Sequence, residues 1–256
     1  MITAMPRIAI AVNDFDAAIK VFRDQMGMFV DDFSPETVPS LGAHVAMCQP
    51  PGGSNIELMA PSNPEEPLSQ ALQKFLDRRG EGVYAMMLEA PDPNAEAEIL
   101  LERGIKVLPL MRGAGGRDIH PSSTHGVLIR IYPDGSVAQP SNPTSAAPYF
   151  SGIQKVMVAT RDASIAGEVY GERLGLAADA PEVDDQRGVL RRLIRPPQGG
   201  VIELVSPVDT TQQVASEIDE FLQSKGEGIC ALVLNAGETI QEQDFELFGT
   251  RFLIEK

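Results

Sequence analysis

Two glutamates stand alone in apolar, strand-like segments that are close copies of each other. Glu57 lies in Ile-Glu-Leu-Met-Ala-Pro (56–61), and Glu203 lies in Ile-Glu-Leu-Val-Ser-Pro (202–207). A carboxylate in such a setting can hold a metal ion, accept a proton as a general base, or form an ion pair. Each segment follows a turn of prolines and glycines and precedes a helix-like run that ends in Gly-Glu-Gly. The two glutamates therefore mark equivalent points of a repeat.

The repeat runs through most of the chain and predicts two domains. Glu57 and Glu203 lie 146 residues apart, as do Pro50 and Pro196. Self-similarity at a fixed spacing is typical of duplication. The segment 133–148 is polar and rich in proline, which is typical of a linker. We therefore predict a first domain at 1–132, a linker at 133–148 and a second domain at 149–256.

Each copy contains units in which a strand is followed by a helix and then by further strands. Apolar alternation predicts the strands, and spacing of three to four residues predicts the helices. Asp14 or Asp16 is expected to cap the first helix, which ends at Gly27. Strands over 43–49 and 55–60 are expected to form a hairpin. In the second unit we expect a strand at 83–89, a helix at 95–103 and strands at 105–110 and 127–132.

The second copy is expected to be incomplete. We align Gly249 with Gly104, so that a final helix ends at Gly249 and only 250–256 remain. The first copy continues from Gly104 to Tyr132 and carries its last strands there. Three explanations stay open: the second domain is an open cup, its missing strands come from another chain in a homodimer, or the polypeptide is truncated.

Composition and charge exclude several classes of function. The chain has 256 residues and a formal charge of −15, with 36 acidic against 21 basic side chains. Nucleic acids and anionic membranes bind basic surfaces, so we expect neither as a partner. No apolar run approaches the length that crosses a membrane, and no signal-like segment begins the chain. The two cysteines favour a reducing compartment, so we expect a cytoplasmic protein without a cysteine-based zinc site.

Several ordered motifs resemble the glyoxalase / bleomycin resistance / dioxygenase superfamily, also called vicinal oxygen chelate (VOC). Within it the chain is most similar to methylmalonyl-CoA epimerases. The resemblance rests on residues 7–28, 56–61, 78–83 and 113–129, and extends more weakly over 150–256. It implies an α+β fold in which tandem, paired βαβββ units form cups of curled sheet, here with an incomplete second domain.

The resemblance also implies where the metal ligands of the family would lie. In the first copy these positions hold Arg7, Glu57, Ala85 and Arg130. In the second they hold Lys155, Glu203 and Ala231, and a fourth strand is missing. Charged arginine and lysine have no lone pair for a metal. We therefore interpret Glu57, flanked by Arg7 and Arg130, as the anionic centre of a degenerate metal site, and we expect no metal cofactor.

Four other residues are predicted to line a ligand site. Met59 and Met87 alternate with the ligand positions and would give a cup an adaptable apolar lining. Lys155 is expected beside Glu203 in the second cup. Arg191 either lines that cup and attracts an anion or faces water on an edge strand.

Three hypotheses for function follow from these residues. The first is a metal-independent binding protein, similar to the bleomycin resistance relatives, that holds a small anionic or acyl molecule in its cup. The second is an epimerase, lyase or isomerase for an acyl-CoA or 2-oxo substrate that uses Glu57 with Arg7 and Arg130. Neighbouring cations stabilise a carboxylate and weaken it as a base, which favours the first hypothesis. The third makes the second domain a dimerisation or regulatory module.

Overall fold

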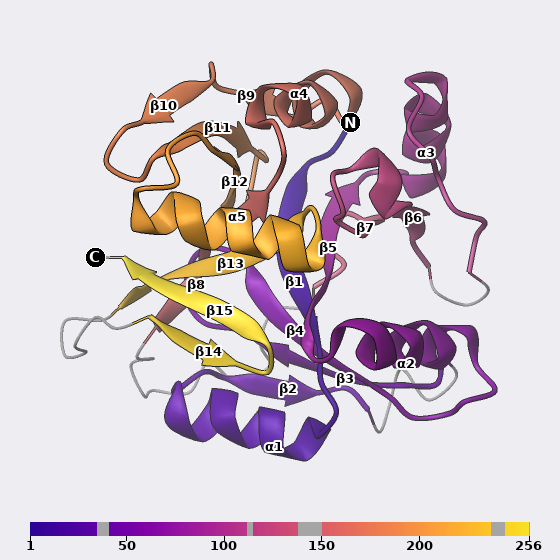
Figure 1. Cartoon of the computed structure of the whole chain (residues 1–256). Helices are drawn as coiled ribbons and strands as arrows, with labels where there is room; N and C mark the ends of the chain where they lie inside the picture. The colour runs from indigo at the N-terminus through magenta and orange to yellow at the C-terminus, as the bar shows by residue number, and fades with distance from the viewer. Residues whose placement is uncertain (35–40, 112–114, 138–149, 237–243, 256) are drawn as a thin grey trace.

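Two curled mixed sheets, one from each half of the chain, stand side by side (Figure 1). The computed structural model describes residues 1–34, 41–111, 115–137, 150–236 and 244–255. The strand order of the first sheet is β2-β3-β4-β1-β5-β7-β6. Its strands are β1 (Ala4–Ala11), β2 (Val30–Asp32), β3 (Ala43–Cys48), β4 (Asn55–Pro61), β5 (Gly82–Ala90), β6 (Arg117–Ile119) and β7 (Ile129–Pro133).

The second sheet repeats this arrangement in the order β10-β11-β12-β8-β13-β15-β14, with β9 paired to β11. Its strands are β8 (Phe150–Ala159), β9 (Ala177–Ala178), β10 (Glu182–Asp184), β11 (Val189–Arg195), β12 (Val201–Pro207), β13 (Gly228–Ala236), β14 (Phe245–Leu247) and β15 (Thr250–Glu255). In both sheets the first strand pairs in parallel with the strand that carries the isolated glutamate. The duplication and the α+β fold are therefore confirmed.

The helices connect and cover these sheets. They are α1 (Phe15–Lys20) with its π-helical extension η1 (Val21–Gln25), α2 (Pro67–Arg79), α3 (Pro93–Glu102), η3 (Pro121–Ser123), α4 (Ala163–Glu168) with η4 (Val169–Arg173), and α5 (Gln213–Lys225). Asp14 caps α1 by accepting a hydrogen bond from the Ala17 backbone N–H (2.9 Å). Gly27 follows η1 with a φ of 65°, a conformation that favours glycine and ends the helix.

The end of the second domain differs from the prediction. β14 and β15 are present, and β15 pairs in parallel with β13 as β7 does with β5. The predicted final helix was wrong because Gly249 corresponds to Gly126 and not to Gly104. Each of these two glycines ends the turn that precedes the last strand, and Leu253 faces Val233 where Arg130 faces Met87. No strand from another chain is needed to complete this sheet.

The two domains differ in the length of the segment before their last two strands, which are β6 and β7 in the first domain and β14 and β15 in the second. Residues 91–116 connect β5 to β6 and contain α3, whereas residues 237–244 connect β13 to β14. The strand predicted at 105–110 is also wrong, because Val107 there forms only an isolated bridge with Ile119. The shorter connection in the second domain is the segment that the sequence reading mistook for a missing part of the fold.

One hydrophobic core joins the two sheets. Alternate side chains of β1 and β8, such as Ile8 and Val156, are fully buried in the same cluster. Helix α1 of the first domain lies beside β14 of the second (Figure 1), where Phe22 packs against Phe252 with ring centroids 6.2 Å apart. The Gly200 N–H also donates to Ser54 Oγ (2.9 Å) across the boundary. The domains are thus packed as one body.

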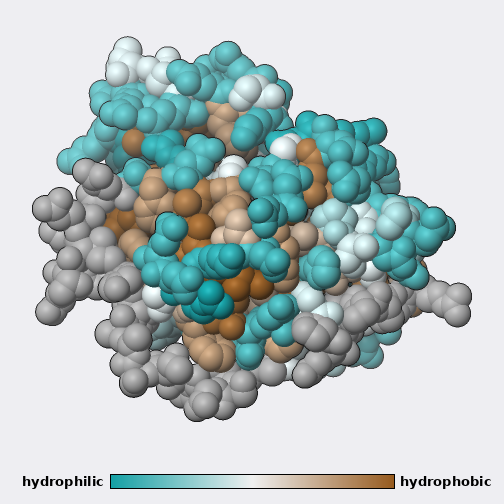
Figure 2. Space-filling model, turned by 90° about the horizontal axis from the view of Figure 1, so that it is seen from below, coloured by the Kyte–Doolittle hydropathy of each residue, from teal (hydrophilic) through white to brown (hydrophobic). Residues whose placement is uncertain are grey.

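The described residues on the lower face of the molecule are mostly hydrophilic (Figure 2). Seen from below in Figure 2, hydrophilic residues surround a patch of apolar ones near the middle of the face. None of the helices in the described part of the chain is both long and apolar enough to cross a membrane.

Candidate functional site

The first cup is built from the inward faces of β1, β4, β5 and β7. The side chains of Arg7, Glu57 and Arg130 are all buried, at 4, 6 and 6% exposure. The register places Arg7 opposite Asn55 on β4 and opposite Met87 on β5. Alternation along the strands therefore brings the predicted charged residues into the interior of the sheet, as expected.

Arg7 and Glu57 form the predicted ion pair. The Arg7 Nε–H donates to Glu57 Oε2 (2.8 Å), and the guanidinium lies 4.6 Å from the centre of the Tyr132 ring. Burial lowers the pKa of Arg7, but the charge and hydrogen bond of Glu57, together with Tyr132 and Glu89, outweigh burial, so that the pKa is raised above its usual value. The Arg7 guanidinium therefore stays charged beside the Glu57 carboxylate.

Arg130 has a different carboxylate partner from the one predicted. Its Nε–H and Nη2–H donate to the two oxygens of Asp118 on β6, at 2.5 and 2.6 Å. This bidentate geometry is the strongest that an arginine makes with a carboxylate. Burial lowers the pKa of Arg130, but the hydrogen bond and charge of Asp118 outweigh it and raise the pKa. Glu57 is therefore paired with Arg7, and the predicted flanking by both arginines is replaced by two separate pairs.

Ser136, at the start of the predicted linker, connects these buried charges through hydrogen bonds. The Arg7 Nη1–H donates to Ser136 Oγ (2.7 Å), and the Ser136 hydroxyl and N–H both donate to Glu89 Oε1 (2.6 and 2.7 Å). Ser136 thus links the Arg7–Glu57 pair to a third buried carboxylate. The segment just after β7 belongs to the wall of the first cup, while 138–149 lie outside the described residues.

Apolar side chains fill the rest of the first cup. Met59 and Met87 are buried beneath α2, in a cluster with Leu72 and Leu76. Phe75 of α2 and Tyr84 of β5 meet edge to face, with ring centroids 5.3 Å apart. Met59 and Met87 therefore pack in a core, and neither lines the cavity of the second domain described below.

The donor set of the first cup does not fit a divalent metal. Arg7, Ala85 and Arg130 supply no lone pair for a cation, and Glu57 already accepts from Arg7. In the described part of the chain, no three His, Cys, Asp or Glu side chains gather where they could hold a metal ion. The metal chemistry of relatives therefore gives no step that these residues can perform.

In the second cup, Glu203 has a partner that the sequence reading passed over. Glu203 is fully buried and accepts from the Arg187 Nη1–H at 2.6 Å. The predicted partners are farther away: Lys155 Nζ lies 3.9 Å and Arg191 Nη1 lies 4.0 Å from its carboxylate oxygens. Lys155 binds Glu255 more closely (2.9 Å), and Arg191 binds Glu182 (3.2 Å).

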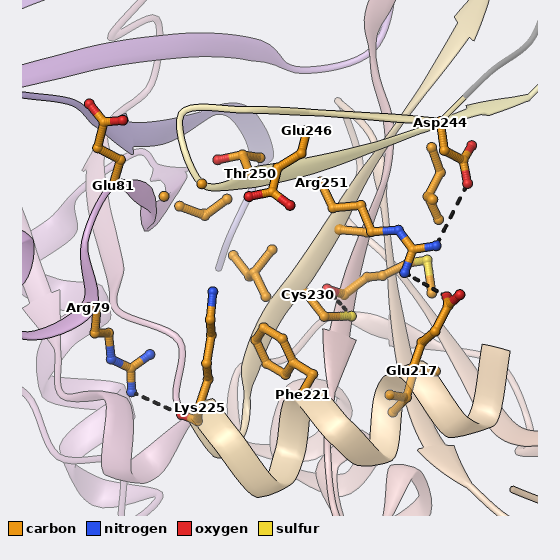
Figure 3. Close-up of a pocket in the computed structure, with 18 of the residues that line it drawn as sticks. Arg79, Glu81, Glu217, Phe221, Lys225, Cys230, Asp244, Glu246, Thr250 and Arg251 are labelled. Atoms are coloured by element: carbon orange, nitrogen blue, oxygen red, sulfur yellow. Dashed lines mark hydrogen bonds and ion pairs between the residues drawn. The ribbon is translucent and has the colours of Figure 1, made fainter. Parts of the chain in front are cut away.

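A cavity of about 290 Å³ lies over this second cup, between α5, β13, β15 and the start of β5. We call it the α5 cavity (Figure 3). Its apolar wall includes Met157, Val214, Ile218, Phe221, Ile229 and Leu253. Arg187 also lines it, so the ion pair of Glu203 forms part of its floor. A concave apolar wall with a few charged groups is the usual form of a small-molecule site.

The α5 cavity lies at a position of the second domain whose equivalent in the first domain is filled by side chains. Cys230 of β13 corresponds to Tyr84 of β5, since each is the third residue of its strand. Phe221 of α5 corresponds likewise to Phe75 of α2, which packs against Tyr84. The smaller side chain of Cys230, and Leu253 in place of Arg130, leave space beside Phe221.

The two ends of the α5 cavity carry different charges. Arg251 at one end is paired with Glu217 (2.6 Å) and with Asp244 (3.8 Å), as Figure 3 shows. At the other end lie Arg79 and Lys225, which form no ion pair within the described residues. Glu81 lies at the same end, and its carboxylate accepts from the Asn13 N–H (2.7 Å), so Arg79 and Lys225 can still meet an anionic group of a ligand.

Cys230 is the thiol of the α5 cavity and is not a reactive one. Burial raises its pKa to about 12, and its S–H donates to the Met157 carbonyl (3.5 Å). The thiol therefore stays protonated at neutral pH.

The sequence reading missed most residues of this cavity. Arg187 was visible as part of an arginine-rich run, and its position just before β11 could have suggested a role. Arg251 and Leu253 were passed over because the last strand was not recognised. Phe221 and Lys225 belong to α5, whose apolar stripe predicts a helix but not a cavity.

The sequence profile of the Glyoxalase/Bleomycin resistance protein/Dioxygenase superfamily matches residues 7–120. This part of the chain belongs to that superfamily. No curated protein sequence matches the chain.

Among solved structures, the chain is similar to a methylmalonyl-CoA epimerase from Streptomyces coelicolor in complex with 2-nitronate-propionyl-CoA. Identity is 26% over 53% of this chain and 100% of that one, with a TM-score of 0.46. The methylmalonyl-CoA epimerase of Mycobacterium tuberculosis is 30% identical over 52% of this chain and 89% of its own, with a TM-score of 0.44.

A mutant of 4-hydroxymandelate synthase from Streptomyces coelicolor is similar over 93% of this VOC chain and 72% of its own. Its identity is 16% and its TM-score is 0.66. This similarity shows that the fold of the VOC superfamily extends over both halves of the chain.

Proposed function

We propose that this VOC protein binds a small, partly apolar anion in the α5 cavity and that it does so without a metal ion. The observation that carries the proposal is the cavity itself, which has an apolar wall and two cations, Arg79 and Lys225, without carboxylate partners in the described chain. An apolar group would be buried against Phe221, and its anionic end would meet these cations.

The first cup supports the proposal by contrast. Its charges are paired within the protein, and α2 covers its apolar residues. A ligand there would have to separate a buried ion pair, which is costly. Glu57 as the base of an epimerase is the weaker hypothesis, because its carboxylate is buried and already accepts from Arg7.

The test is calorimetric titration with octanoate, a small apolar anion, on the wild type and on Cys230→Tyr. The substitution restores at position 230 the residue type that fills the first cup, so we expect at least about a tenfold loss of affinity. The matched control is Val208→Tyr, since Val208 is exposed and outside the cavity. Equal binding by the wild type and Cys230→Tyr would overturn the proposed site.

A second measurement guards against misfolding of the variant. Cys48 is fully buried, so slow alkylation of the native wild-type protein by N-ethylmaleimide should report Cys230. We expect octanoate to slow this reaction. An unchanged rate at saturating octanoate would contradict binding in the α5 cavity.

The metal-free part of the proposal has its own test. Elemental analysis of the purified protein should find less than one divalent ion per chain after dialysis. One tightly held ion per chain, lost on Glu57→Gln, would overturn it.

A further inference from the structure

A second hollow, of about 550 Å³, adjoins the α5 cavity at the boundary between the domains. We call it the boundary groove. Arg79 and Lys225 line both hollows, and Figure 3 shows them at one end of the α5 cavity. Arg161 and Arg173 from the second domain complete a group of four cations around the groove.

The charges of these four cations are not neutralised by a neighbouring carboxylate. Within the described residues, none of the four has a carboxylate oxygen within ion-pair distance. The two other arginines that line the α5 cavity are paired, Arg187 with Glu203 and Arg251 with Glu217. Among the described residues that line the groove, Glu227 is the one carboxylate beside these four cations, so they form a local positive patch on a chain with 36 acidic and 21 basic side chains.

The backbone holds two of the surrounding arginines in place. The Arg79 Nη2–H donates to the Lys225 carbonyl (3.5 Å), and the Arg103 Nη1–H donates to the Arg173 carbonyl (3.1 Å). These contacts join the two domains at the groove. They use carbonyl oxygens, so the guanidinium charges are not neutralised.

The acidic residue that lines the groove is engaged elsewhere. Glu227 contacts His125 Nδ1 through both carboxylate oxygens (3.1 Å) and accepts from the Arg161 N–H (2.8 Å). A Cβ on Gly126 would overlap the Glu227 carbonyl oxygen, so this segment is packed tightly against the first domain. The Glu227 carboxylate is held by these contacts and leaves the four cations free for a ligand.

We propose that the boundary groove binds a phosphate or diphosphate group of the ligand whose apolar part occupies the α5 cavity. This rests on the proposed function, because it assigns the anionic end of the same ligand. Guanidinium groups bind phosphate oxygens in pairs, and several cations favour a multiply charged anion over a carboxylate. The residues shared by the two hollows place the phosphate next to the apolar wall.

The test compares three probes at one ionic strength: inorganic pyrophosphate, octanoate, and octyl phosphate below its micelle concentration. The groove variant is Arg161→Gln/Arg173→Gln, which leaves the α5 cavity intact. The control is Arg195→Gln, because Arg195 is exposed, paired with Asp179 and outside both hollows.

We expect octyl phosphate to bind the wild type at least about tenfold more tightly than octanoate does. The groove variant should lose this advantage and the binding of pyrophosphate, while octanoate binding and the control stay unchanged. Raising the salt concentration should weaken pyrophosphate more than octanoate.

Failure of this inference can be told apart from failure of the proposed function. If octanoate binds and Cys230→Tyr blocks it, but octyl phosphate binds no better than octanoate, the inference is overturned and the proposed function stands. If pyrophosphate binds through Arg161 and Arg173 while octanoate does not bind at all, the groove is supported and the apolar cavity is overturned.

Discussion

The two cups descend from one repeat and treat the same glutamate in different ways. In the first, Glu57 pairs with the buried Arg7 of β1, Ser136 binds Arg7, and Phe75 packs against Tyr84. In the second, Glu203 pairs with Arg187, which is itself part of a cavity wall. Among the described residues, the same scaffold therefore holds packed side chains in the first cup and a cavity over the second.

The difference arises from a few side chains and one connection. Cys230 stands where the first cup has Tyr84, and Leu253 stands where it has Arg130. The chain between the last strands is also shorter in the second domain. Duplication thus preserved the strand order, while changes of side-chain size decided which cup has room for a ligand.

The largest effect should come from breaking the ion pair of the first cup. Glu57→Leu leaves Arg7 buried without a counter-charge, so we expect it to lower the free energy of unfolding by about 3–5 kcal/mol. Glu203→Leu should cost less, about 1–2 kcal/mol, because Arg187 borders the α5 cavity and can be hydrated there. Chemical denaturation measures both variants.

The matched control for this comparison is the double variant Arg7→Met/Glu57→Leu. Removing both charges should recover much of the stability, because no buried charge is left unpaired. Equal losses for Glu57→Leu and Glu203→Leu would contradict the distinction between a packed first cup and a second cup with a cavity over it.

A smaller change in stability is expected from exchanging Tyr84, which fills the first cup, and Cys230, which leaves space in the second. Tyr84→Cys removes a packed ring from the first cup and should cost about 2–3 kcal/mol, as large-to-small changes do. Cys230→Tyr places a ring where a cavity exists and should cost less than about 1 kcal/mol. Thermal unfolding of both variants checks this. A larger loss for Cys230→Tyr than for Tyr84→Cys would show that the cavity is not available space.

The smallest effect should come from the partly exposed pair of Glu217 and Arg251. Burial raises the pKa of Glu217, but hydrogen bonds from Gln213 and Arg251 outweigh it, so the pKa lies below its ordinary value of 4.5. A lowered pKa stabilises the folded state above pH 4.5 and loses this effect as the pH falls through the folded value.

We therefore expect Glu217→Gln to cost about 0.5 kcal/mol at about pH 6 and almost nothing at about pH 3. Urea denaturation of wild type and variant at the two values measures this difference. A difference that grows toward acid pH would contradict the lowered pKa.

The sequence by itself determined the duplication, the α+β fold and the inward position of Glu57, Arg7 and Glu203. The duplication and the elements follow from local signals, such as alternation along a strand, the Asp14 cap and glycines that end helices, whereas the inward positions follow from the resemblance to the VOC superfamily. The resemblance places Arg7 and Glu57 in one site, and the parallel pairing of β1 with β4 brings them together. The last strands were misread because one glycine was aligned with the wrong partner.

Only the tertiary structure decided which charges meet and which cup has space. Arg130 binds Asp118 on the neighbouring short strand, and Arg187 reaches Glu203 from a turn before β11. At the boundary groove, Arg79 of the first domain lies near Arg161 and Arg173 of the second. Such contacts depend on side-chain volume and on segments distant in the chain, and neither leaves a periodic signal in the sequence.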